Sequence, residues 1–183
     1  LTVAQDFQLR KAVRGAGGDA SVQLGSFDAR RVSGAFHTGL TGSGFAMLGR
    51  VSALQNNGYR DHSGVLGRSA FVSGGWFGDR TIVKATALVG LLADTLSYTG
   101  ATLAELAQNR KYNPLGVDER DRFGQQMFAL SVSHARPSGT TVNTTIYRNS
   151  ASGNYDYFDT ADRYRFNLAH AWYGATSAVN MER

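Results

Sequence analysis

The sequence contains no cysteine, only two prolines and no long apolar run. Without cysteine, neither a disulfide framework nor a thiolate metal site can form. No run approaches the roughly 18 apolar residues of a membrane-spanning helix, and the N-terminus lacks the pattern of a secretory signal peptide. Because the chain begins at Leu1, we expect a mature or excised fragment.

Residue types that carry out catalysis or hold metals are present, but their spacing is not that of a site. Four histidines are dispersed along the chain: His37, His62, His134 and His170. No serine lies in a nucleophile-elbow sequence. The acidic group at residues 118–121 lacks the spacing of a calcium loop and is interleaved with arginine. We therefore expect no enzyme, no metal and no cofactor.

The chain is basic, with a net charge of +5. Nucleic-acid binding requires that such charge gather in a patch or stripe. The lysines and arginines are instead spread singly through expected turns and strand ends. This is the pattern of solvated surface charge, so no nucleic-acid partner is expected.

Short runs that alternate between apolar and polar residues dominate the chain and predict strands with one apolar face. Eight such runs lie near residues 20–24, 31–40, 45–53, 70–76, 83–91, 127–133, 141–147 and 164–173. The fifth is the clearest, with an apolar set opposite Lys84 and Thr86: Val83, Ala85, Ala87, Val89 and Leu91. The sequence therefore predicts an all-β protein of about eight antiparallel strands.

The connections between these runs alternate in length. Those near Thr41, Gly78 and Pro137 are short, whereas those after the third, fifth and seventh runs are long. Short turns at one rim and long loops at the other are typical of an up-and-down transmembrane β-barrel. Aromatic residues near strand ends are typical of interfacial girdles: Phe45, Trp76, Phe77, Tyr164 and Trp172.

The stretch from Tyr98 to Gln126 alternates least and carries the highest density of charge. Thr102 and Glu105 have the spacing of a capping box, which predicts a short helix from about Leu103 to Lys111. Pro114 cannot continue that helix, and the residue before a proline leaves the helical region. We expect residues 93–122 to form one long extracellular loop. Loops of this length are usually functional or mobile.

Five motifs occur in a fixed order at residues 26–31, 57–63, 109–114, 121–126 and 153–158. Together they resemble the first third of the barrel of TonB-dependent outer-membrane receptors. The resemblance implies a fragment of a 22-stranded barrel, with residues 1–19 as the end of a plug domain or linker and 20–183 as partial barrel. Residues 1–3 resemble the last strand of such a plug, whereas the plug itself and the energy-coupling box are absent.

The resemblance further implies a receptor in the cell outer membrane that imports a scarce nutrient, such as a ferric siderophore or other iron chelate. Its partners would be outer-membrane lipid, its own plug domain, the TonB complex and the iron chelate. Guanidinium groups suit the oxygens of anionic chelates. Our candidates for ligand capture from the long loop are Arg110, Lys111, Tyr112, Arg120 and Arg122.

Three other interpretations remain open. The charges of the long loop could instead pair with its acidic residues and order it: Glu105, Asp118, Glu119 and Asp121. The chain could be a soluble β-sandwich that binds glycans through Tyr155 and Tyr157. It could also be a complete, structural eight-stranded barrel, although complete barrels usually end on an aromatic residue and this chain ends on Arg183.

Overall fold

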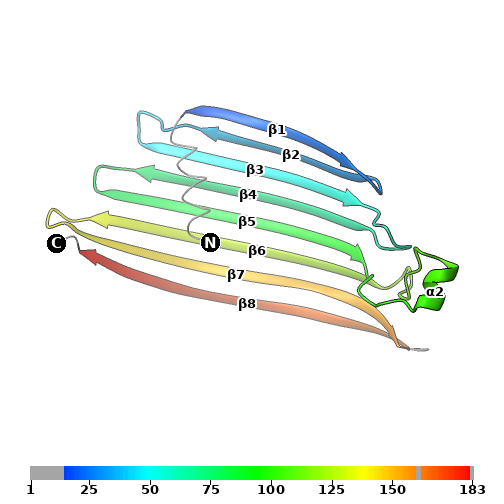
Figure 1. The fold of residues 1–183 in the computed structure, drawn as a ribbon. Coiled ribbons are helices and arrows are strands. Elements are labelled where there is room, and N and C mark those ends of the chain that lie inside the picture. The colour runs from blue at the N-terminus through cyan, green and yellow to red at the C-terminus, as the bar shows by residue number, and fades with distance from the viewer. Residues whose placement is uncertain (1–14, 160–161, 182–183) are drawn as a thin grey trace.

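The computed structural model describes residues 15–159 and 162–181 as one antiparallel sheet with a short helix at one end (Figure 1). The expected plug-like segment at residues 1–3 lies outside the described residues. The strands are β1 (Ala16–Gly25), β2 (Ala29–Thr38), β3 (Phe45–Asn56), β4 (Val65–Phe77), β5 (Thr81–Thr95), β6 (Arg120–Ala135), β7 (Thr140–Asp159) and β8 (Asp162–Met181), and the helix is α2 (Leu103–Gln108).

The strands lie in chain order from β1 to β8, and each pairs with its neighbours along the chain. The expected all-β, antiparallel, up-and-down arrangement is therefore confirmed. The sheet is open, because β1 pairs with β2 and β8 with β7, with no pairing between the two outer strands among the described residues. The strands lengthen from 10 residues in β1 to 20 in β8.

Several strands extend beyond the alternating runs that predicted them. β1 begins at Ala16, and β6 begins at Arg120 instead of near residue 127. β7 and β8 run through the stretch after Asn149, so the long loop expected after the seventh strand is wrong. Backbone hydrogen bonds to a neighbouring strand need no alternation of side chains. The connection between β5 and β6 is accordingly residues 96–119, shorter than the expected 93–122.

The register divides the side chains between two faces. Val83, Ala85 and Ala87 of β5 lie opposite Trp76, Gly74 and Val72 of β4. We call the side of the sheet that carries these residues the apolar face. Its large side chains are exposed, as Val51 at 60% and Leu91 at 58% illustrate. The large residues of the apolar face thus do not pack into a core.

The opposite side, the polar face, carries hydroxyl and charged residues. Hydroxyl pairs cross between neighbouring strands, at 2.7 Å for Ser21–Ser33 and 2.9 Å for Ser73–Thr86. Ser73 and Thr86 are buried. Arg31 and Arg50 lie on this face too, since they occupy the positions that alternate with the apolar set. The greater burial of this face is what curvature of the sheet around it would produce.

Tyr164, Phe166 and Trp172 of β8 lie on the polar face, whereas Tyr173 lies on the apolar one. Phe166 stacks on Tyr155 with ring centroids 4.8 Å apart, and His170 stacks on Trp172 at 4.9 Å. Phe45 and Trp76 do lie on the apolar face, as an interfacial girdle requires. The expected girdle is therefore wrong for Phe77, Tyr164 and Trp172, because a shift of one position reverses the face of a strand residue.

Candidate functional site

The connection between β5 and β6 (residues 96–119) is a folded cap at one rim of the sheet (Figure 1). Its helix begins with the expected capping box: the backbone N–H of Thr102 donates to Glu105 Oε2 at 2.7 Å, and the N–H of Glu105 donates to Thr102 Oγ1 at 3.3 Å. The N–H of Thr102, and after it the Thr102 hydroxyl, which also donates to Glu105 Oε2 at 2.7 Å, hold the pKa of the Glu105 carboxyl below its ordinary value. The helix ends at Gln108, three residues before the expected Lys111, because Asn109 is already extended.

Arg60, in the connection between β3 and β4, clamps this cap to the sheet. Its Nη1 donates to the carbonyl oxygens of Ser97 and Thr99 at 2.7 and 2.8 Å, and its Nε donates to that of Tyr112 at 3.2 Å. The neighbouring Asp61 donates its N–H to the carbonyl of Lys111 at 2.7 Å. Hydrogen bonds therefore join two connections that are distant in sequence.

Buried polar side chains hydrogen-bond to the backbone within the cap. Asn113 is 6% exposed, and its Nδ2 donates to the carbonyl of Leu96 at 2.9 Å while its Oδ1 accepts from the N–H of Leu115 at 3.2 Å. Glu119 is buried and accepts from the N–H of Gly116. Of the expected ion pairs, Arg120–Asp118 forms at 4.0 Å between exposed groups, an arrangement worth little energy. Arg60 and Asn113 order the cap more than the expected charge pairing does.

The five candidates for ligand capture fall into two groups. Arg110 and Lys111 are exposed on the cap just after α2, and Tyr112 is half-buried beside them. Arg120 and Arg122 instead lie in β6, in line with Ala93 and Thr95 on the apolar face. The five candidates therefore lie in two separate places and not together in one loop.

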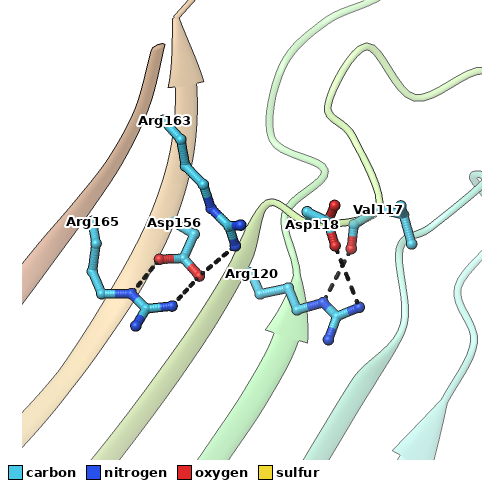
Figure 2. Close-up of polar contacts among 6 residues, drawn as sticks. All are labelled: Val117, Asp118, Arg120, Asp156, Arg163 and Arg165. Atoms are coloured by element: carbon cyan, nitrogen blue, oxygen red, sulfur yellow. Dashed lines mark hydrogen bonds and ion pairs between the residues drawn. The ribbon is translucent and has the colours of Figure 1, made fainter.

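The second group lines one hollow together with Asp156, Arg163 and Arg165 of the β7–β8 hairpin. Figure 2 shows Asp156 between Arg163 and Arg165, and Arg120 beside Val117 and Asp118. The carboxylate of Asp156 accepts two hydrogen bonds from Arg165, at 2.6 and 2.9 Å, and lies 3.5 Å from Nη2 of Arg163. Its side chain is only 7% exposed. This part of the hairpin extends beyond the last β6–β7 pair, Asp121–Tyr155.

Sequence reasoning missed Arg60, Asp156, Arg163 and Arg165. One signal was present, because Arg163 and Arg165 are two residues apart and must share a face in any strand. Asp156 lies across the hairpin, and only the register of β7 and β8 brings it to Arg165.

Among the described residues, no group of histidine, cysteine and acidic side chains could hold a metal ion. No helix within the same residues is long and apolar enough to cross a membrane. In comparisons with known proteins, no protein-family model matches the chain and no curated protein matches it significantly.

Proposed function

We propose that these residues form part of the wall of an outer-membrane β-barrel, within a TonB-dependent receptor that takes up a scarce nutrient such as a ferric siderophore or other iron chelate. One observation carries the membrane part: a single up-and-down antiparallel sheet exposes most of its large apolar residues, such as Val51, Val72 and Leu91, on one face. An apolar surface of this extent marks a membrane or an interface, and alternation of lipid-facing and lumen-facing residues is the pattern of a barrel wall.

The two alternative architectures fit the described residues less well. A β-sandwich needs a second sheet packed on the first, whereas residues 15–159 and 162–181 form one. A complete eight-stranded barrel needs β1 paired with β8, and the described strands leave both edges open. A segment of a larger wall needs neither.

The transport part rests on the motifs that resemble TonB-dependent receptors and on the ordered cap at one rim. Exposed Arg110 and Lys111 would meet an anionic chelate first, because they project from the cap and lie outside the Arg60 clamp. A preorganised cap lowers the ordering cost of binding. Electrostatic capture of this kind must weaken with salt.

The membrane part can be tested with the two tryptophans of the chain. Trp76 lies on the apolar face and Trp172 on the polar face, and their exposed fractions are similar, at 38% and 46%. In vesicles made with brominated lipids, we expect strong fluorescence quenching in the W172F variant, which keeps Trp76, and weak quenching in W76F, which keeps Trp172. Equal quenching of the two variants would contradict the membrane assignment.

The ligand part can be tested in the same vesicles by titration with ferric chelates. The double variant R110Q/K111Q should bind an anionic chelate more weakly, and its difference from the native chain should shrink as salt rises. R136Q is the matched control, because Arg136 lies in the β6–β7 turn at the opposite rim. Equal affinity of the native chain and R110Q/K111Q would exclude capture by these residues.

A further inference from the structure

Four arginines lie on the two strands that flank β7, where these strands approach the cap. Arg120 and Arg122 belong to β6, and Arg163 and Arg165 belong to β8 (Figure 2 shows three of the four). The four line one hollow of about 120 Å³, which we call the arginine hollow. It is completed by three further residues, all of them polar or charged: Asp118, Asn154 and Asp156.

The charge of the arginine hollow is not balanced. Four guanidinium groups lie against two carboxylates, which leaves a surplus of two positive charges. Arg120 donates from Nε to the carbonyl of Val117 at 3.1 Å and lies 4.0 Å from Asp118. The guanidinium of Arg122 makes no hydrogen bond or ion pair with any residue of 15–159 or 162–181. The β6 side of the hollow therefore holds N–H donors that no described residue uses.

Asp156 fixes the β8 side of the hollow. Its side chain is only 7% exposed, and its carboxylate accepts two hydrogen bonds from Arg165 and lies 3.5 Å from Nη2 of Arg163. A guanidinium carries five N–H donors in a planar fork, so Arg165 retains donors beyond the two that Asp156 accepts. Because the carboxylate already holds both arginines in place, an anion that binds them incurs a smaller ordering cost.

The spacing of the strands suits an anion with oxygens on several sides. Neighbouring strands lie about 4.8 Å apart, so β6 and β8 are separated by roughly twice that distance across β7. A planar carboxylate presents both of its oxygens to one side, whereas the oxygens of phosphate or sulfate point toward both walls at once. Charge-assisted hydrogen bonds of about 2.7–2.9 Å can then reach one ion from β6 and from β8. The hollow has the volume of about four water molecules, which is enough for such an ion.

We propose that the arginine hollow binds one tetrahedral oxyanion of the phosphate or sulfate class from solution. Arg120 and Arg122 bind it from β6, and Arg163 and Arg165 bind it from β8. Because the ion then touches both strands, it joins the strand that leaves the cap to the β7–β8 hairpin. Arg120 and Arg122 thus serve this ion and not the transported chelate.

The surroundings of the hollow favour an ion from solution. The side chains of Arg163 and Arg165 are 52% and 59% exposed, so water reaches the hollow directly. Polar side chains separate it from the large apolar residues of the same face: Gln126, Arg148, Ser150 and Ser152. Binding of an ion here therefore does not depend on the proposed membrane function.

Equilibrium dialysis with radiolabelled phosphate tests this site. The whole chain is kept in non-ionic detergent near neutral pH at constant ionic strength, and sulfate or malonate competes for the bound phosphate. We expect saturable binding of one phosphate per chain and its displacement by sulfate. Malonate, a dianion built from planar carboxylates, should compete about tenfold less well. Equal competition by malonate, or no saturable binding, would overturn the proposed site.

R122Q is the sharpest variant, because the Arg122 guanidinium has no partner in the described part of the chain and its loss removes no contact that the fold uses. It should bind phosphate about tenfold more weakly. R30Q is the matched control, since Arg30 lies on the same face in β2 and outside the hollow, and it should bind like the native chain. R122K keeps the charge but not the planar fork, and it should stay weaker than the native chain. Full recovery in R122K, or an equal loss in R30Q, would indicate diffuse attraction instead of a defined site.

Hydrogen exchange provides a second readout that needs no variant. Phosphate should slow the exchange of the amides at residues 120–122 and 163–165 in the native chain, because the ion joins β6 to β8. Malonate at the same ionic strength should leave their exchange unchanged. Phosphate binding without slower exchange at these residues would place the ion elsewhere and refute the assignment to the arginine hollow.

Discussion

At the scale of single residues, neighbours along β5 face different surroundings. Ala87 lies on the apolar face between Val72 and Phe128. Gly90, three positions later, lies on the polar face, and a Cβ added there would meet no atom within 4 Å. Thr86 is a poor comparison because it is buried and hydrogen-bonded to Ser73. Ala87 and Gly90 are therefore a matched pair of substitution sites on one strand, one on each face.

We expect A87R to prevent membrane assembly and G90R to permit it. A charge on the lipid face at the bilayer midplane costs about 2–4 kcal/mol, whereas an arginine at residue 90 would enter open polar space. Resistance of the assembled sheet to protease, with and without detergent, measures the outcome. Similar resistance of both variants would show that the faces are wrongly assigned.

At the scale of elements, Arg60 is the contact that joins the cap to the β3–β4 connection. R60A should loosen residues 96–119, because three carbonyl oxygens lose a charged donor and each such bond contributes about 1.5–3 kcal/mol. Hydrogen exchange of the cap amides should then accelerate by more than tenfold, with strand amides unchanged. R110A, an exposed arginine of the same cap, is the control, and equal acceleration there would argue against the clamp.

The start of α2 should respond to acid. The capping box lowers the pKa of Glu105 below its ordinary value of 4.5, so its contribution is complete above pH 4.5 and is lost as the pH falls through the lower, folded value. We expect exchange of the α2 amides to rise in that acid range in the native chain. E105Q should show no such pH dependence, and an unchanged acid response in E105Q would assign the effect to another group.

At the scale of the whole molecule, the open sheet has two unsatisfied edges. β1 and β8 each lack a partner on one side within the described residues, and unpaired backbone groups are costly in hydrocarbon and prone to pairing in water. Produced by itself, the chain should associate edge to edge and need detergent to stay dispersed. Light scattering after gel filtration tests this. A detergent-free monomer that unfolds cooperatively would contradict the wall assignment.

Local interactions could be predicted from the sequence alone. The alternation of Val83, Ala85 and Ala87 assigned the faces of β5, since side chains of a strand alternate whatever lies beside it. The capping box at Thr102 and Glu105 could be predicted in the same way, because both partners lie within one helical turn. The order and antiparallel arrangement of the strands followed from the same local patterns.

The tertiary structure alone decided which distant groups meet. It extended β6 to Arg120 and so moved Arg120 and Arg122 out of the loop and onto the face of the sheet. It also brought Arg60 to the cap and Asp156 to Arg165. These contacts depend on cross-strand register and loop closure, in which backbone hydrogen bonds between distant segments determine where polar side chains lie, and no local period encodes them.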